Sequence, residues 1–160
     1  MSTRPIVKTE PLTIPNGDVV LEAELLLPDD ASGAVPGVVV CHPHPRYGGD
    51  MRNNVVVAIV QGVLSRGFGA LRFNFRGAGR STGTHSKGPG EQEDALAAFA
   101  ALREHDAIDA EQLALAGYSF GANIALSVAP HLHEAHGIAA VAPPIQGLSR
   151  PEVLNYLKPT

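Results

Sequence analysis

The sequence is poor in several residue types, and each shortage narrows the function it can have. Cys41 is the only cysteine in 160 residues, so no disulfide can form within the chain, which favours a reducing compartment such as the cytoplasm. Basic residues do not predominate, because the formal net charge is −4, and this argues against a nucleic-acid-binding surface. No apolar run approaches the roughly 20 residues that cross a bilayer, and the N-terminus lacks the apolar core of a secretory signal. We therefore expect a cytoplasmic protein with neither nucleic-acid nor membrane partners.

The remaining composition and its patterning indicate one α/β domain over residues 1–160. The hydrophobic fraction of 44% suffices for one core. An antiparallel hairpin is predicted over 10–27, with Asn16-Gly17 at its turn. After it, short apolar segments alternate with amphipathic ones: strands are predicted at 37–41, 70–75, 113–116 and 137–142, and helices at 54–66, 91–105 and 120–129. This alternation predicts a mostly parallel sheet with helices on both faces, a three-layer sandwich with the hairpin at one edge.

In such a sheet the active site is built by loops at the carboxyl ends of the strands, here 42–53, 76–90, 117–121 and 143–150. The loop Gly117-Tyr118-Ser119-Phe120-Gly121 fits the G-x-S-x-G nucleophile elbow. A sharp strand-to-helix turn forces its serine into strained backbone geometry and exposes the hydroxyl above the sheet. The glycines are needed because strand and helix backbones approach too closely there for a Cβ atom. Ser119 is therefore the candidate nucleophile, and Gly117 and Gly121 are the elbow glycines.

A second motif, His42-Pro43-His44-Pro45, follows the strand predicted at 37–41. This strand is expected beside the one that carries Ser119, so both loops would face one pocket. An oxyanion hole needs two N–H donors, one from the residue after the nucleophile, Phe120, and one from this loop. Since proline has no N–H, the backbone amide of His44 is the predicted second donor. A metal site is the alternative for these histidines, but no companion ligands at structural-zinc spacing occur, so we expect no metal.

Three further patterns favour structural explanations. Gly77-x-Gly79 misses the dinucleotide-binding spacing by one residue and follows an internal strand. Arg76, beside it, is interpreted as a hydrogen-bond donor that organises its loop, and Ser81 as a local cap. The histidines 131, 133 and 136 lie beyond the helix that follows Ser119, which rises about 1.5 Å per residue, so they are expected far from the hydroxyl at a solvated helix end.

Together the elbow, the His-Pro repeat and Arg76-Gly77-x-Gly79-x-Ser81 resemble the α/β-hydrolase superfamily. The likeness is greatest to its small bacterial predicted-hydrolase branch, related to serine esterases, dienelactone-hydrolase-like enzymes and serine aminopeptidases. It covers roughly residues 10 to 160. The resemblance implies Ser119 as the nucleophile and the amides of His44 and Phe120 as the oxyanion hole. It also implies that the protein hydrolyses an ester, thioester or amide of a small acyl substrate through an acyl-enzyme, without a cofactor. The alternative is a non-catalytic protein of this fold that binds a small ligand, or an inactive truncated hydrolase.

The sequence departs from this superfamily after Ser119. The superfamily places an acid and then a histidine on later loops, and here the only later acids are Glu134 and Glu152. We therefore expect the domain to be C-terminally incomplete, with acid and base beyond Thr160. Three pocket-side residues are predicted, His42, Tyr118 and His85, and one of the pocket-side imidazoles could substitute weakly as a base. The strand at 137–142 would then be a bare sheet edge, through which a homo-oligomer could form.

Overall fold

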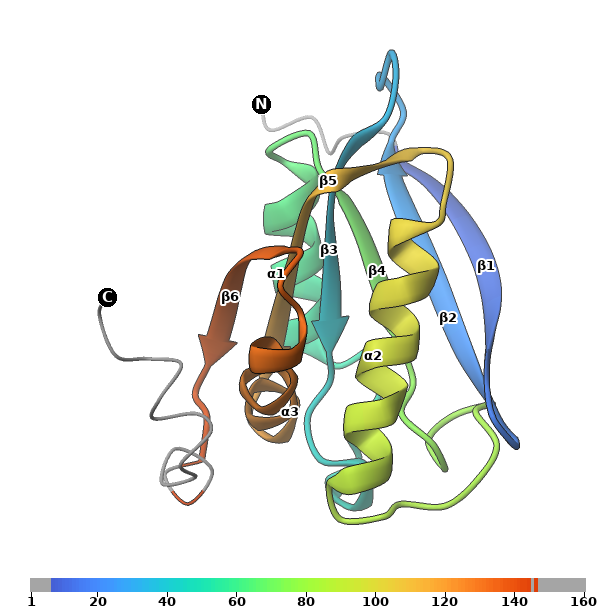
Figure 1. The fold of residues 1–160 in the computed structure, drawn as a ribbon, viewed down its shortest axis with the longest axis vertical. Helices are drawn as coiled ribbons and strands as arrows, with labels where there is room; N and C mark the ends of the chain where they lie inside the picture. Colours follow the sequence, from blue (N-terminus) through green and yellow to red (C-terminus); the bar gives the residue numbers. More distant parts are fainter. Residues whose placement is uncertain (1–6, 145, 147–160) are drawn as a thin grey trace.

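The computed structural model describes residues 7–144 and 146, and these form a mixed six-stranded sheet between two layers of helices (Figure 1). The strands, in chain order, are β1 (Val7–Asn16), β2 (Val19–Pro28), β3 (Val35–Cys41), β4 (Gly69–Phe73), β5 (Ile108–Tyr118) and β6 (Ala135–Val141). The helices are α1 (Asn54–Leu64), α2 (Pro89–Arg103) and α3 (Phe120–Val128), with short 3-10 turns at Pro45–Tyr47 and Ala129–His131. The spatial order of the strands is β1-β2-β4-β3-β5-β6. The predicted α/β fold class is confirmed.

The sheet combines an antiparallel edge with a parallel centre. β1 and β2 form the predicted hairpin, and Gly17 at its turn has a φ of 58°, which glycine adopts without strain. β2 pairs antiparallel with β4, whereas β3 is parallel to both β4 and β5, and β5 is parallel to β6. As predicted, the strand before the His-Pro repeat therefore lies beside the strand that leads to Ser119.

The observed strand bounds differ from the predicted ones in several places, and β4 and β5 differ in ways that have a physical explanation. β4 ends at Phe73, two residues early. The amide of Asn74 still donates to the backbone carbonyl of Glu22 in β2, but the amide of Phe75 turns away from the sheet and donates to a histidine ring. β5 begins at Ile108, five residues early, and includes an exposed polar segment at 109–112. The pairing of β5 with β3 is irregular there, with a register shift between Val35 and Gly37. Because this segment is polar and largely exposed, the apolar pattern of the sequence did not indicate that the strand extends through it.

The helices bury two separate apolar clusters, one on each face of the sheet. On one face, α2 and α3 cover the larger cluster, which includes Phe73, Phe99 and Leu115. On the other, α1 contributes Val56, Val60 and Leu64 at a spacing of four residues. Ile59 and Val63, which belong to the same predicted apolar stripe, are only partly buried.

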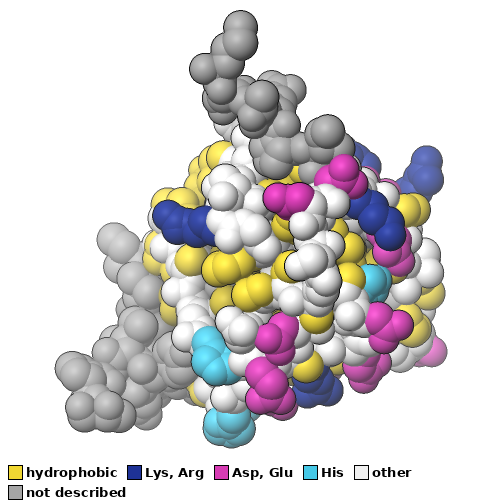
Figure 2. All heavy atoms as spheres, turned by 90° about the horizontal axis from the view of Figure 1, so that it is seen from above, with side chains coloured by type: hydrophobic (Ala, Val, Ile, Leu, Met, Phe, Trp, Pro, Cys, Tyr) yellow, Lys and Arg dark blue, Asp and Glu magenta, His cyan; other side chains and the backbone are white. Residues whose placement is uncertain are grey.

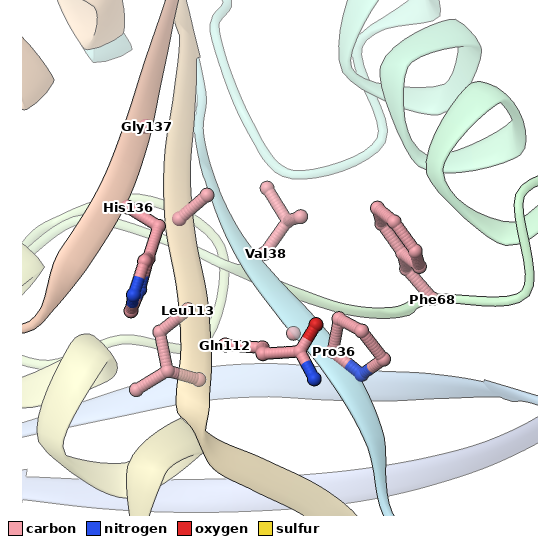
Figure 3. A pocket seen from close by; sticks show the side chains of 9 residues that line it. Pro36, Val38, Phe68, Gln112, Leu113, His136 and Gly137 are labelled. Atoms are coloured by element: carbon pink, nitrogen blue, oxygen red, sulfur yellow. The ribbon is translucent and has the colours of Figure 1, made fainter.

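The face that carries α1 is not completely covered near β6. A pocket of about 260 Å³ lies over the starts of β3 and β6, and Figure 3 shows Val38, Phe68, Leu113 and His136 among its lining residues. A neighbouring pocket of about 460 Å³ is lined by Ile59 and Val63 of α1 together with small residues of β5 and β6. The unburied part of the α1 stripe thus faces an open groove. Within the described residues β6 is the edge of the sheet, and Val141 at its end is 39% exposed.

The surface carries charges of both signs. The end of the molecule seen in Figure 2, which is the upper end of Figure 1, shows acidic, basic and apolar side chains interspersed. The loops that follow β3 and β5 lie at the opposite end (Figure 1). In residues 7–144 and 146 no helix is both long and apolar enough to span a bilayer.

Candidate active site

Ser119 occupies a strained position between β5 and α3. Its φ of 54° and ψ of −117° lie outside the regions that non-glycine residues favour, at a cost of about 1–3 kcal/mol. Its backbone amide donates to Val141 at 2.9 Å and its carbonyl accepts from Asn123 at 3.2 Å, so the bend is fixed on both sides. The side chain is half-buried and makes no hydrogen bond to any described residue. The hydroxyl is therefore neither packed into the interior nor used as a helix cap.

The glycines on either side of Ser119 are required by close backbone contacts. A Cβ atom on Gly117 would collide with the carbonyl of Gly121, one turn into the elbow. A Cβ atom on Gly121 would collide with the backbone carbonyls of Cys41 and His42, at the end of β3. Gly121 thus joins the elbow directly to the His-Pro loop.

Three of the four predicted site loops meet at the ring of Phe120, the residue that follows Ser119. The ring centroid of His44 lies 5.0 Å from that of Phe120 and 4.6 Å from that of His85, and the rings of His85 and Phe120 are 5.5 Å apart. These residues come from loops 42–53, 117–121 and 76–90. The fourth loop, 143–150, lies mostly outside the described residues, as does Glu152.

The two predicted oxyanion donors lie on adjoining segments. The amide of Phe120 is the first of α3, where helix amides have no intrahelical acceptor. The amide of His44 donates no hydrogen bond within residues 7–144 and 146, although the His44 carbonyl accepts from Tyr47 and Gly49. The His44 ring accepts the amide of Arg46 at 3.1 Å. Burial and the neighbouring His85 and Arg46 lower the pKa of this ring. Among the described residues neither amide has a hydrogen-bond acceptor, and the catalytic role of both stays a prediction.

His42 does not face the pocket, which corrects our expectation for it. The side chain is completely buried, Nε2 accepts the amide of Phe75 at 3.0 Å, and Nδ1 lies 2.6 Å from the carbonyl oxygen of Pro43. Burial lowers the pKa of His42 to about 4, despite opposing contributions from Pro43 and Asp50. Since both ring nitrogens are engaged inside the fold, His42 cannot exchange a proton with a substrate.

His85 and Tyr118 are both half-buried beside the elbow. Nδ1 of His85 lies 2.9 Å from Oε1 of Glu91, although the two groups are too poorly aligned for a hydrogen bond. Burial alone would raise the pKa of Glu91, but hydrogen bonds from Ser86 and Gly88 outweigh it and lower the pKa. Glu91 is thus a buried carboxylate behind His85. Tyr118 immediately precedes Ser119, and its placement on the pocket side stays a prediction.

Arg76 organises its loop, as predicted. Its guanidinium donates to the fully buried carboxylate of Asp94 at 2.8 Å, and its amide donates to the same carboxylate at 2.9 Å.

Ser81 is not a helix cap: its hydroxyl donates to the carbonyl of Asn74 and accepts the amide of Glu22. The histidines 131, 133 and 136 are exposed. Across the described part of the chain, no three His, Cys, Asp or Glu side chains are grouped as metal ligands.

Sequence reasoning missed Asn74 and Asp94. Asn74 is 3% exposed and connects the His-Pro loop to strand β2, because its Oδ1 accepts the amide of Met51 and its Nδ2 donates to Glu22. In the sequence, Asp94 looks like one of the polar residues on the exposed side of α2. Only the structure shows that it is buried and paired with Arg76. For Asn74, the one available signal was a polar residue between two phenylalanines.

Comparison with known proteins agrees with this geometry. Residues 16–153 match the family described as X-Pro dipeptidyl-peptidase (S15 family). The chain is 36% identical over 124 residues to the uncharacterised protein RP471 of Rickettsia prowazekii, a match that covers 78% of this chain and 51% of that protein.

Two solved structures are similar over most of the chain. The lidless α/β serine hydrolase XC6422 of Xanthomonas campestris shows 35% identity and a TM-score of 0.78, with 86% of this chain and 62% of that chain covered. An α/β serine hydrolase homologue of Coxiella burnetii shows 34% identity and a TM-score of 0.77, with 91% and 66% covered. The chain thus spans about half of the curated relative and less than two thirds of each of these two structures. By its matched residues and its fold, the chain belongs to the S15 family of X-Pro dipeptidyl-peptidases, within the α/β-hydrolase superfamily.

Proposed function

We propose that the protein is a serine hydrolase in which Ser119 attacks the carbonyl carbon of an ester, thioester or amide with a small acyl group. The Ser119 oxygen forms a bond to that carbon, the hydroxyl proton passes to a base, and the alcohol, thiol or amine leaves with a proton. Water then hydrolyses the acyl-enzyme and releases the carboxylic acid. The observation that carries this proposal is the strained backbone of Ser119, whose hydroxyl has no hydrogen-bond partner among the described residues and which precedes Phe120, where three loops converge.

The oxyanion of each tetrahedral intermediate would be bound by the amides of His44 and Phe120. Such donors are each worth about 10²–10³ in kcat when they are held in place before reaction. The support for this assignment is that the His44 amide has no acceptor within the described residues and that the His44 ring packs on Phe120 at 5.0 Å.

The base is proposed to come from a segment beyond Thr160. A serine hydroxyl is a weak nucleophile without a base, and His42 is excluded because both of its ring nitrogens are engaged. His44 uses Nδ1 to accept an amide, and His85 has Nδ1 against Glu91. The relatives extend well beyond the length that this chain covers, which leaves room in them for an acid and a histidine.

The small acyl group is proposed because the similar Xanthomonas protein is described as lidless. A cytoplasmic location remains proposed from the single cysteine, Cys41.

Covalent labelling tests the proposed nucleophile. The full-length protein is treated with a fluorophosphonate, which reacts with activated serines, and the modified peptide is identified by mass spectrometry. We expect modification at Ser119, none in Ser119→Ala, and unchanged labelling in Ser65→Ala, since Ser65 lies at the exposed end of α1. An unreactive Ser119 in the folded full-length protein would contradict the enzymatic function and favour ligand binding.

Turnover tests the proposed base. Hydrolysis of p-nitrophenyl acetate by residues 1–160 is compared with that by the full-length protein. Because general base catalysis contributes about 10²–10⁴-fold, we expect the 160-residue chain to be slower by at least about 10²-fold. Equal rates, abolished in both by Ser119→Ala, would show that the base lies within residues 1–160.

A further inference from the structure

The loop that presents the His44 amide is held at both ends by two consecutive residues after β4. At its start, the amide of Phe75 donates to Nε2 of His42 at 3.0 Å. At its end, the amide of Met51 donates to Oδ1 of Asn74 at 2.8 Å. Both contacts are buried. Asn74 is in turn held by Glu22 of β2, to which its Nδ2 donates at 2.7 Å.

These contacts fix the tautomer of His42. A backbone amide can only donate, so Nε2, which receives the Phe75 amide, carries no proton. Nδ1 lies 2.6 Å from the carbonyl oxygen of Pro43, which can only accept, so Nδ1 carries the proton. The ring is therefore neutral and protonated at Nδ1. Each of its nitrogens makes one hydrogen bond, and neither is free for the substrate.

The hydrogen bond from Nδ1 of His42 to the Pro43 carbonyl connects His42 to the His44 amide. The carbonyl of Pro43 and the amide of His44 belong to the same peptide unit, which is planar and trans. In a trans unit the C=O and N–H bonds point in opposite directions. When His42 draws the Pro43 carbonyl toward the interior, the His44 N–H must therefore point away from it. A hydrogen bond to the carbonyl also polarises the peptide and strengthens its N–H as a donor.

We propose that His42 is a positioning residue, which orients the Pro43–His44 peptide unit so that its N–H faces the reacting carbonyl, and that Asn74 holds the other end of the same loop. This inference rests on the proposed function, since it assigns how the oxyanion donor of that function is held. His42 acts through the His44 amide and does not touch the substrate. A merely space-filling role would be met by an apolar side chain of similar size, and this difference makes the inference testable.

The packing around His42 supports this role. Its ring lies edge-on to Phe75, with centroids 4.8 Å apart, and Phe75 lies edge-on to Phe120 at 5.8 Å. The His42 carbonyl also lies against Gly121, where no Cβ atom fits. His42 thus touches the elbow as well as the loop, so the two oxyanion donors are aligned through one residue.

The test compares His42→Leu, which removes both hydrogen bonds, with His42→Gln, whose amide offers an acceptor and a donor. Phe99→Leu is the matched control for lost packing, because Phe99 is a buried core residue of α2 away from the loop. Ester hydrolysis by the full-length protein is followed as kcat and KM, and thermal unfolding is followed in parallel. We expect His42→Leu to lower kcat by about 10²-fold with KM within about twofold. We expect His42→Gln to recover part of kcat and Phe99→Leu to lower thermal stability but not kcat.

Nitrogen NMR on the wild-type protein gives a readout independent of activity and of the folding of any variant. We expect long-range ¹H–¹⁵N spectra to show His42 neutral, with Nδ1 protonated. Protonation at Nε2, or titration of His42 near pH 6.5, would overturn the inference, as would an unchanged kcat in folded His42→Leu. If wild-type Ser119 is unreactive, the proposed function fails, whereas the tautomer measurement still decides whether His42 holds the Pro43–His44 peptide.

Discussion

His42 should make the protein lose stability in mild acid, and most of this loss should occur before the carboxylates titrate. Burial lowers the pKa of this imidazole to about 4 in the folded chain, whereas an unfolded histidine titrates near 6.5. Below pH 6.5 the unfolded chain therefore binds a proton at this residue that the folded chain does not accept. Stability rises with pH wherever the unfolded state binds more protons. Lowering the pH therefore removes stability, beginning near pH 6.5 and ending near pH 4.

The size of the loss follows from the two pKa values. Each unit of difference corresponds to about 1.4 kcal/mol, so the full effect is about 3 kcal/mol. Between pH 7 and pH 4.5, where most carboxylates are still ionised, the free energy of unfolding should fall by about 2 kcal/mol on account of His42 alone. Protonation would also convert Nε2 from an acceptor to a donor facing the Phe75 amide, which is itself a donor.

Urea denaturation at closely spaced pH values measures this effect. His42→Gln serves as the reference, because it has no ionisable group at this position and leaves the other histidines unchanged. The difference in unfolding free energy between wild type and His42→Gln should shrink by about 2 kcal/mol from pH 7 to pH 4.5. Parallel curves for the two proteins would refute the reasoning, since they would mean that His42 titrates alike in the folded and unfolded chain.

Three further predictions concern other parts of the molecule. Gly121→Ala should destabilise the fold by about 3 kcal/mol in urea denaturation, since its Cβ would collide with the Cys41 carbonyl. Gly62→Ala, which has open space around it, should instead stabilise α1 by about 1 kcal/mol. Equal effects of the two substitutions on unfolding free energy would contradict the close packing at Gly121. The thiol of Cys41, whose pKa burial raises to about 12, should resist Ellman's reagent at pH 8 until the chain is unfolded, and rapid labelling of the native protein would show that the end of β3 is open. If residues 1–160 associate through the β6 edge, Val141→Lys should shift their sedimentation toward the monomer, and identical profiles would exclude that edge.

The fold was predictable because apolar spacing carries the information that a layered α/β domain needs. Short apolar strands and amphipathic helices alternate along the chain, and the right-handed crossover rule then places neighbouring strands. The errors lie where polar or single-residue effects decide. β5 starts at Ile108 and passes through a polar segment that pairs irregularly. β4 stops early because the amide of Phe75 donates to the His42 ring instead of to the neighbouring strand. Neither effect leaves a periodic trace in the sequence.

The meeting of the predicted site loops could be inferred from the sequence, but the contacts that hold them in place could not. The elbow follows from local backbone geometry, so the glycines around Ser119 could be assigned from their spacing alone. The role of His42 could not, because it depends on Phe75, which is 33 residues away. A histidine next to a motif looks the same in the sequence whether its nitrogens face a pocket or are used inside the fold. Only the positions of two backbone groups, the Phe75 amide and the Pro43 carbonyl, distinguish these cases.

The close contact at Gly121 explains why the two halves of the site should act together. The first turn of α3 lies directly on the carbonyls of Cys41 and His42, with no side chain between them. The Phe120 amide belongs to that turn, and the His44 amide follows those carbonyls by two residues. A displacement of either segment therefore moves both donors relative to Ser119. The proposed oxyanion donors must lie within about half an ångström of their place to act on a developing oxyanion. On the proposed function, even a modest loosening of this contact should therefore lower kcat before it unfolds the protein.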